Sequence, residues 1–454
     1  TNLGSVWSGR RDDARAAPDA VELISIRLRR PVVKENTMAS STAEPILPLG
    51  FDFTSPDVMV KGLPIEEFAR LRRTEPVWWN AQDPDNAGGF HDGGYWVISK
   101  HKHIREISRD PETWSSHDKG CVMRYDNAVS PEEFELTKVM MHNSDAPAHT
   151  RLRKLISRGF TPRAVQSLED RLTRTAHDIV RAAADKGAGD FVRDVSHRLP
   201  LLAIAELLGF PAKDHERLFE WTNAVMTAED PESPHDARQS LAELLAYAYE
   251  LAEQRIAEPA EDIITKLVHA DVDGEKLSEI EFGYFVLVLV VAGNETTRNA
   301  TSLGISALLD NPDQWALYRA RRPATAADEV IRWATPVNAF QRTARRDTDI
   351  DGVPVKAGDR VGLFYGSANY DEDAFDDPFA FNILRDPNPH LAFGGTGPHY
   401  CIGANLARME VNIMLNAIAD HLPHIRKTAD PTRVRSGWIN GIATMPVDYG
   451  TPSI

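Results

Sequence analysis

The chain has 454 residues, an apolar content of 42% and a formal net charge of −16. This length can bury a large core, and the acidic balance argues against broad nucleic-acid binding, which needs clustered Lys and Arg. Two cysteines cannot build a disulfide framework, which favours a reducing compartment, so a cytoplasmic protein is expected.

The first 45 residues differ in composition from the rest of the chain. Charge, Pro and Ser dominate them, with one short apolar patch, "VELISI". We expect residues 1–45 to form a mobile N-terminal extension, with a docked arm as the alternative. The chain begins at Thr1, and Met38 is a candidate natural start. Residues 46–454 show no linker and are predicted to form a single catalytic domain.

Most of this domain is predicted to be helical, because apolar residues recur at three- and four-residue spacing. The clearest helical segments are 65–73, 165–187, 240–259, 312–323 and 404–422. Short strands are expected within 94–99, 349–365 and 445–449, where alternating apolar residues meet Gly and Pro. The pattern predicts a mainly α fold with small sheets.

One segment, "SDAPAHTRLRKLISRGFTP", places His149 and Arg153 four residues apart, and therefore on one face of a helix. Cationic donors on one face suit a carboxylate ligand. A histidine at such a position is otherwise a surface or capping residue.

The next segment, "FGYFVLVLVVAG", is the longest apolar run in the chain. Its length is below the ~18–20 residues needed to span a bilayer. We expect a buried helix and no transmembrane anchor. The N-terminus also lacks the apolar core of a secretory signal.

That run leads directly into Ala292, Gly293, Glu295 and Thr296. Small residues leave room for a ligand beside the helix, and an alcohol next to a carboxylate can relay protons. The alternative is structural: Gly293 marks a kink, and Thr296 bonds back to its own helix.

Further along, "ADEVIRWATP" places Glu329 and Arg332 three residues apart, so that they can pair on one helical face. A solvated surface pair is the ordinary interpretation of such spacing.

Cys401 follows a glycine-rich loop and precedes a strongly amphipathic helix. At a helix N-terminus, free backbone N–H groups favour a thiolate. A structural zinc site would need four Cys or His ligands. The segment alone leaves three interpretations: a buried inert cysteine, a catalytic nucleophile, or an axial ligand of haem iron.

Taken together and in this order, these segments and Arg342 resemble the cytochrome P-450 family, the haem-thiolate monooxygenases, over residues 46–450. The resemblance implies a triangular prism, mainly α with a smaller β-rich part. The haem would lie between the long central helix and the helix after Cys401. It also implies insertion of one oxygen atom from dioxygen into a C–H bond.

The resemblance assigns roles to individual residues. It implies that Cys401 is the axial ligand of the iron of haem b (iron protoporphyrin IX) and that Thr296 and Glu295 deliver protons. It makes Glu329 and Arg332 a structural pair. The family often adds an Arg to this pair, but Ala380 holds that position here. Arg385 or His390 is a candidate substitute. The haem propionates would be held by His149, Arg153, Arg342 and His399, and the other haem contacts would be Ala292, Gly293, Phe393, Gly394 and Gly403.

One departure from the family pattern lies beside the ligand. The family usually has Phe seven residues before the Cys, whereas here Gly394 holds that position and Phe393 comes one residue earlier.

Five stretches are most similar to an actinobacterial branch of the family that oxidises cholesterol. They are "AGNETTRN", "WATPVNAFQRTA", "FNILRDPNPH", "FGGTGPHYCIGANLAR" and "RSGWINGI". The similarity implies hydroxylation of the terminal side-chain methyl of cholesterol or cholest-4-en-3-one, with further oxidation to the acid. The candidate pocket residues are Val122, Met123, Val288, Val337, Phe340 and Trp438, and ordinary core packing is the alternative for each.

The sequence shows no fused flavin or ferredoxin domain. The family then implies electrons from NAD(P)H through separate proteins, a ferredoxin or flavodoxin with its reductase. Residues 151–154, "RLRK", together with Arg408, are candidate docking contacts. Two alternatives stay open: oxygenation of branched fatty acids, other terpenoids or a secondary metabolite, and a non-catalytic haem sensor or carrier. The Glu295–Thr296 pair argues against the second.

Overall fold

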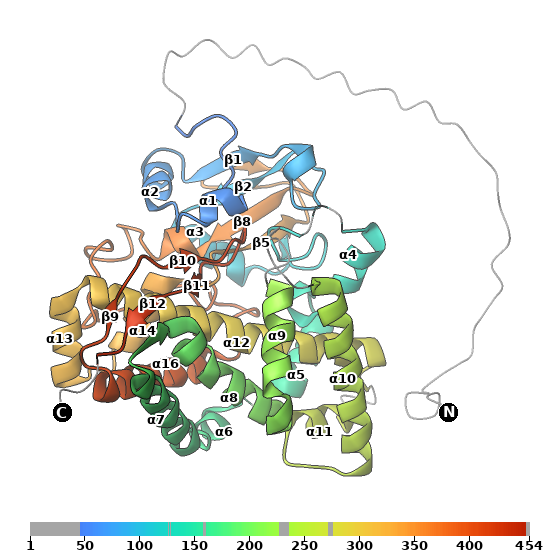
Figure 1. Ribbon diagram of the computed structural model, residues 1–454. Coiled ribbons are helices and arrows are strands. Elements are labelled where there is room, and N and C mark those ends of the chain that lie inside the picture. The colour runs from blue at the N-terminus through green and yellow to red at the C-terminus, as the bar shows by residue number, and fades with distance from the viewer. Residues whose placement is uncertain are drawn as a thin grey trace. The chain divides into compact units, whose positions relative to one another are not determined.

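The computed structural model describes residues 46–125, 127, 129–157, 160–226, 236–270 and 276–450. The chain divides into two units, Thr1–Leu49 and Gly50–Ile454. The predicted extension, residues 1–45, lies outside the described residues. All the functional residues predicted from the sequence belong to the second unit, whose elements are labelled in Figure 1.

Helices dominate this unit, as their periodicity predicted. They are α1 (Pro56–Met59), α2 (Ile65–Thr74), α3 (His101–Arg109), α4 (Pro131–Thr137), α5 (Ala148–Ser157), α6 (Pro162–Gln166), α7 (Glu169–Lys186), α8 (Arg198–Leu208), α9 (His215–Met226), α10 (Ala237–Ala257), α11 (Ile263–Val268), α12 (Glu279–Asp310), α13 (Pro312–Arg321), α14 (Ala326–Ala334), α15 (Tyr365–Ala368) and α16 (Ala404–His421).

One predicted helix is interrupted. The segment 165–187 was expected to be continuous, but α6 ends at Gln166 and α7 begins at Glu169. The N–H of Ser167 closes the end of α6 by bonding the carbonyls of Arg163 and Val165. Two acidic residues in the first turn of α7 favour a new helix start.

In the described part of the chain, the strands form four small sheets. They are β1 (Val77–Ala81), β2 (Gly94–Ile98), β3 (Trp114–Ser115), β4 (Ala188–Asp190), β5 (Ala339–Ala344), β6 (Thr348–Ile350), β7 (Val353–Val355), β8 (Arg360–Phe364), β9 (Arg426–Lys427), β10 (Thr432–Arg433), β11 (Ile442–Thr444) and β12 (Pro446–Asp448). The largest sheet has the order β1-β2-β8-β5-β3, and only its β2–β8 pair is parallel. The others are β4-β12-β9 and the pairs β10-β11 and β6-β7.

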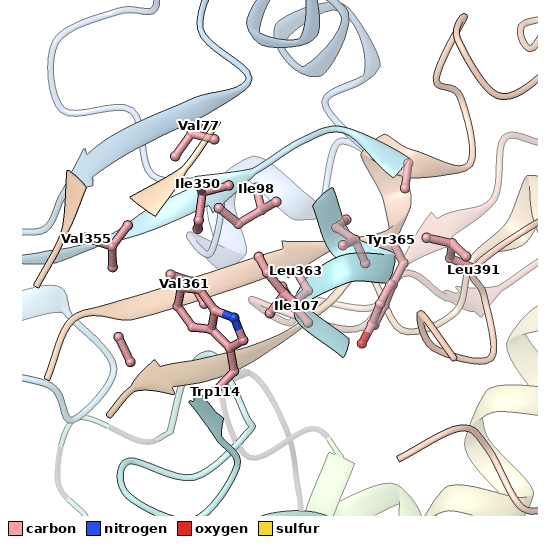
Figure 2. Close-up of a cluster of buried hydrophobic side chains, with 13 residues drawn as sticks. Val77, Ile98, Ile107, Trp114, Ile350, Val355, Val361, Leu363, Tyr365 and Leu391 are labelled. Atoms are coloured by element: carbon pink, nitrogen blue, oxygen red, sulfur yellow. The ribbon is translucent and has the colours of Figure 1, made fainter. Parts of the chain in front are cut away.

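The largest sheet packs one face against α3 around a buried apolar cluster (Figure 2). Ile104 and Ile107 of α3 meet Ile98 of β2 and Val361 and Leu363 of β8 there. Burial of such aliphatic side chains contributes roughly 1.5–3 kcal/mol each. The cluster therefore holds β5, which carries Arg342, in a fixed place relative to the helices.

The helix α12 is the central element of the unit. It contacts α8, α9, α10, α14 and α16, and α9 and α10 lie in front of it in Figure 1. Ser278 and Glu281 form a reciprocal capping box at its start. Among the described residues, α12 is also the one helix whose length and composition would let it cross a membrane, but 56% of its apolar window is buried inside the unit. A buried core helix has the same composition.

Candidate functional site

The loop before α16 turns tightly around Cys401. The Cys401 N–H donates to the Phe393 carbonyl at 2.9 Å, which brings this residue next to the cysteine in spite of the longer spacing. Gly394, Thr396 and Gly397 take positive φ values of 95°, 75° and 87° and thereby accommodate the additional residue. At Gly397 a Cβ atom would lie 2.1 Å from the Ser108 carbonyl oxygen, so only glycine fits.

The two cysteines lie in different environments. Cys121 is buried, and burial raises the pKa of its thiol to about 12. Cys401 is the accessible one, three residues before the first residue of α16. The pKa of the Cys401 thiol is also raised by burial, and the Gly403 N–H, Arg153 and Arg408 oppose this only in part.

The surrounding protein thus opposes the thiolate in spite of the helix terminus, although the residue itself is exposed. A metal cation bound to the sulfur would stabilise the thiolate.

A group of cationic side chains from separate segments gathers near this loop. His149 of α5 and His399 of the loop lie with ring centroids 4.1 Å apart. Arg153, one turn after His149, donates to the Tyr400 carbonyl at 2.6 Å. Arg342 of β5 is buried and donates to the Gln341 carbonyl at 2.7 Å.

The pKa values show how closely these groups interact. Burial, Arg153 and Arg342 lower the pKa of His149 to about 4, against a weaker opposing effect of Asp145. The pKa of His399 falls well below its usual range through burial, followed by Arg342 and His149. Within the described residues, the Nε2 atom of His149 has no hydrogen-bond partner.

The Asp145 carboxylate, which acts on His149, already accepts bonds from Ser115, Ser116 and Arg345. With these pKa values His149 and His399 are neutral at neutral pH, so the positive charge comes from Arg153 and Arg342, and buried cations without an anion of their own are costly. The donor set therefore suits an anionic ligand, and carboxylates match it chemically.

The middle of α12 is buried except for a group of accessible residues. Twenty residues of this helix are buried, whereas Ala292 at its centre is exposed and its neighbours at four-residue spacing, Tyr284, Val288 and Thr296, are partly accessible. Val291 and Gly293 beside them are also partly accessible. These residues therefore form an accessible face of α12, although other helices pack against the rest of the helix.

Gly293 does not kink the helix, which continues through it from Glu279 to Asp310. A Cβ atom at Gly293 would lie 3.1 Å from Ile204 of α8, so the glycine permits close packing of the two helices. The Thr296 hydroxyl donates to the Ala292 carbonyl at 2.7 Å, as the structural alternative proposed.

Glu295 points away from that accessible face. It is 1% exposed and its Oε1 atom accepts from Arg298 and from the Asn299 amide, the latter at 3.0 Å. Its Oε2 atom and the Arg298 Nε have no partner among the described residues. The structure thus gives Glu295 and Thr296 separate partners.

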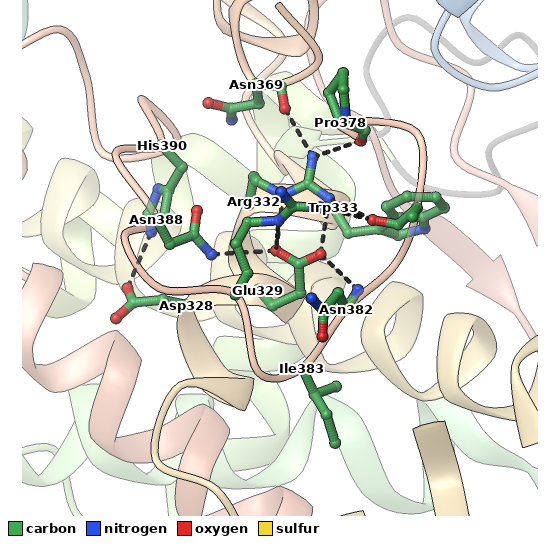
Figure 3. Close-up of polar contacts among 12 residues, drawn as sticks. Asp328, Glu329, Arg332, Trp333, Asn369, Pro378, Asn382, Ile383, Asn388 and His390 are labelled. Atoms are coloured by element: carbon green, nitrogen blue, oxygen red, sulfur yellow. Dashed lines mark hydrogen bonds and ion pairs between the residues drawn. The ribbon is translucent and has the colours of Figure 1, made fainter. Parts of the chain in front are cut away.

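The predicted ion pair of Glu329 and Arg332 is completely buried. Figure 3 shows Glu329 bound to Arg332 through two hydrogen bonds of 2.7 and 2.8 Å. Of the two candidate partners, Arg385 contacts Glu329 at 3.1 Å, whereas His390 contacts Asp328 at 2.9 Å. The pair is therefore not a solvated surface contact.

Three of the apolar pocket candidates come together. Val337 pairs with Ile439 in an isolated β-bridge, and the Phe340 and Trp438 rings lie 6.1 Å apart, all three predicted residues being partly accessible. Val122 is also partly accessible.

Met123, however, does not belong to an accessible surface. It is 0% exposed, and its thioether packs beside Gly362 of β8. For Met123 the alternative of ordinary core packing is correct, because the strand without a side chain at Gly362 leaves a gap that the methionine fills.

The comparisons with known proteins agree with this geometry. Residues 325–446 match the family model described as Cytochrome P450. The chain is 54% identical over 414 residues to a protein named Steroid C26-monooxygenase from Rhodococcus jostii (strain RHA1), covering 91% of this chain and 88% of the relative.

The chain belongs to the cytochrome P450 family. A Steroid C26-monooxygenase from Mycobacterium tuberculosis (strain ATCC 25618 / H37Rv) is 55% identical over 411 residues, with 90% of this chain and 95% of the relative covered. A Methyl-branched lipid omega-hydroxylase from Mycobacterium bovis (strain ATCC BAA-935 / AF2122/97) is 39% identical over 395 residues, with 84% and 90% covered.

Among solved structures, a Mycobacterium marinum cytochrome P450 in complex with pseudoionone superposes with a TM-score of 0.80 at 34% identity and covers 90% of this chain and 100% of that chain. The predicted cytochrome P450 fold is therefore confirmed. As a member of the family, the protein is a monooxygenase that uses haem and dioxygen.

The side chains of this P450 fit a haem on three independent counts. Cys401 is accessible, Arg153 and Arg342 have no carboxylate partner among the described residues, and the centre of α12 is left accessible.

Two residues that contact or influence His399, Ser116 and His142, were not predicted from the sequence. Ser116 shares a hydrogen bond of 3.1 Å with the His399 Nε2 atom, and His142 is close enough to lower the pKa of His399. A lone serine or histidine in a loop has no periodic signal, so only the fold identifies these contacts.

Proposed function

We propose that this monooxygenase hydroxylates the terminal side-chain methyl of a sterol, with cholesterol or cholest-4-en-3-one as the substrate and oxidation to the acid as a further step. The observation that carries the proposal is the identity of 52–55% over about nine-tenths of the chain to relatives named Steroid C26-monooxygenase. Apolar, accessible side chains at Val288, Val337, Phe340 and Trp438 support it, because an aliphatic chain gains free energy mainly by apolar burial.

Haem b would be held by Cys401 as the axial ligand and by His149, Arg153, Arg342 and His399 at its propionates. Phe393, Gly394 and Gly403 shape the loop beside the sulfur, and Ala292 and Gly293 would be the haem contacts on α12. Bound there with a thiolate ligand, haem supplies the dioxygen activation on which the reaction depends.

The protein's own part in the reaction is proton handling and exclusion of water. We assign proton delivery to Thr296 and Glu295. Thr296 lies on the accessible face of α12, so its hydroxyl can exchange the Ala292 carbonyl for a ligand or water. Glu295 has one oxygen atom without a partner among the described residues, and so retains a free acceptor.

Electrons would come from NAD(P)H through a separate ferredoxin or flavodoxin and its reductase. Of the basic residues expected to guide the carrier, Arg151 is paired with Glu281 and Arg408 donates to Asp328 at 2.6 Å, while Lys154 is exposed. We propose that the protein is cytoplasmic and that residues 46–454 form its one catalytic domain.

The axial ligand is tested by spectra of the reduced, CO-bound protein. Cys401→Ser should abolish the red-shifted Soret band of a thiolate complex, and Cys121→Ser should leave it intact. The reverse result would move the ligand to Cys121.

The substrate is tested by titrating the ferric holoenzyme with cholest-4-en-3-one and, separately, with a methyl-branched fatty acid. The sterol should shift the haem to high spin and give a terminally oxidised product. The relatives named Methyl-branched lipid omega-hydroxylase favour the fatty acid as the second candidate. A spin shift and product with the fatty acid alone would replace the sterol by that candidate, without affecting the assignment to the family.

A further inference from the structure

The accessible face of α12 extends well beyond the residues assigned to the reaction. Tyr284, Val288, Ala292 and Thr296 recur at four-residue spacing and are all at least partly accessible inside an otherwise buried helix. Twelve residues separate the first from the last, which corresponds to about 18 Å along a helix that rises 1.5 Å per residue. This length is comparable with that of a sterol whose side chain is extended.

The chemical character changes along this face. Thr296 carries a hydroxyl at one end, Ala292 and Val288 are apolar, and Tyr284 carries a phenol at the other end. A sterol has the same distribution, with an apolar nucleus and side chain and one oxygen atom on ring A. If the terminal methyl lies near Thr296, the ring-A oxygen is directed toward the Tyr284 end.

The Tyr284 hydroxyl is available as a donor. In the described part of the chain no hydrogen bond to it is present, and its pKa is raised by burial and by the nearby Glu133 carboxylate, so the phenol keeps its proton. Glu133 itself is engaged in the capping box of α4, where it accepts from the Ser130 N–H at 2.8 Å.

We propose that the Tyr284 hydroxyl donates a hydrogen bond to the ring-A oxygen of the substrate and so selects oxygenated sterols over apolar molecules of the same shape. The inference rests on the proposed sterol hydroxylation and adds the residue that recognises the far end of the molecule. Apolar burial supplies most of the affinity, and Tyr284 sets the direction of entry.

The experiment compares two ligands in the holoenzyme. Cholest-4-en-3-one and 5α-cholestane share the nucleus and side chain, but only the first has a ring-A oxygen. Both are titrated at one cyclodextrin concentration, and the high-spin shift gives Kd for each. Tyr284→Phe should reduce the preference for the enone by roughly 2- to 13-fold, the range of a net hydrogen bond, while the Kd of 5α-cholestane stays unchanged.

Tyr249→Phe is the matched control. Tyr249 belongs to α10, and its ring lies against Gly283 beside the same part of α12. The control should leave the ratio of the two Kd values unchanged. In turnover, Tyr284→Phe should raise KM for the enone with little change in kcat, because the contact is remote from the reacting methyl.

The outcomes separate the two proposals. If the wild-type protein binds both ligands and Tyr284→Phe leaves their Kd ratio unchanged, the role of Tyr284 is wrong and sterol hydroxylation stands. If cholest-4-en-3-one gives no spin shift in the wild-type protein, the sterol proposal fails and the role of Tyr284 fails with it. An equal weakening of both ligands would assign Tyr284 to packing and would also overturn the inference.

Discussion

Two Glu–Arg ion pairs have the same three-residue spacing, Glu329–Arg332 in α14 and Glu295–Arg298 in α12. They differ in how many of their donor and acceptor atoms have hydrogen-bond partners. Both pairs are buried, with side chains at most 4% exposed. In α14 both oxygen atoms of Glu329 are engaged, by Arg332, by Arg385 at 3.1 Å and by the Asn382 N–H at 2.9 Å. Arg332 also donates to the carbonyls of Asn369 and Pro378.

The pair in α12 is satisfied only in part. One oxygen atom of Glu295 and the Arg298 Nε lack partners within the described residues. A buried polar group left without a partner carries a free-energy penalty. Among the described residues, the α14 pair is therefore the better satisfied of the two.

The largest loss of stability is expected for Glu329→Gln. Removing the charge leaves Arg332 and Arg385 buried without their anion, which costs about 3–5 kcal/mol. The measurement is the unfolding free energy of the holoprotein in denaturant. Asp328→Asn is the matched control, since this neighbouring side chain is 34% exposed and should cost about 1 kcal/mol or less. Equal losses for the two variants would contradict a structural role for the Glu329 network.

A pH-dependent loss of stability is expected at His197, which lies close to Arg298 of the α12 pair. Burial, Arg298 and Arg198 lower the pKa of His197 to about 4, against the opposing effects of the Val192 carbonyl and Asp190. Because this folded pKa is below the unfolded value of 6.5, the contribution to stability is complete above pH 6.5 and is lost as the pH falls toward 4.

Between pH 7 and pH 5 the loss should be about 2 kcal/mol. The unfolding free energy of the wild-type protein and of His197→Gln, measured across this range, should therefore converge at low pH. Parallel pH curves for the two proteins would show that His197 is not buried in its neutral form.

A smaller change in stability than at Glu329 is expected for Glu295→Gln. The substitution leaves the buried Arg298 without its anion but breaks fewer bonds than at Glu329, so it should cost about 3 kcal/mol, the low end of the range for a broken buried pair. Product formed per NADH consumed, measured with a supplied ferredoxin and reductase, should fall because proton delivery is impaired. A variant that is fully coupled would remove Glu295 from the proton-delivery role.

The smallest change in stability is expected for Thr296→Ala. Its hydroxyl bonds only to its own helix, so unfolding should change by no more than about 0.5 kcal/mol. Substrate binding should persist while electrons are diverted to hydrogen peroxide. Thr296→Ser is the control and should retain coupling. Unchanged coupling in Thr296→Ala would mean that water alone delivers the protons.

The features that the sequence predicted best are those that depend only on residues nearby in the sequence. The helical segments around α10, α13 and α16 were expected from periodicity within a few residues of their observed ends. The accessible cysteine beside the start of α16 follows from a short run of glycines and an amphipathic pattern. Both features depend on backbone geometry that neighbouring residues determine.

Contacts between distant segments were predicted less completely. The choice between Arg385 and His390, the separate partners of Glu295 and Thr296, and the burial of Met123 could not be derived from spacing. Each depends on which side chains the fold brings within about 3 Å of one another, over separations of many tens of residues along the chain.

The sequence by itself determined the helical class, the family, the identity of the cysteine and the Glu329–Arg332 pair, whereas the Glu295–Arg298 pair was found only in the structure. Only the tertiary structure decided that one pair is saturated and the other is not, and that α12 leaves a face accessible from Tyr284 to Thr296. The physical reason is that burial and hydrogen-bond saturation are properties of packed neighbours. Two identical local patterns therefore acquire different roles when different segments pack against them.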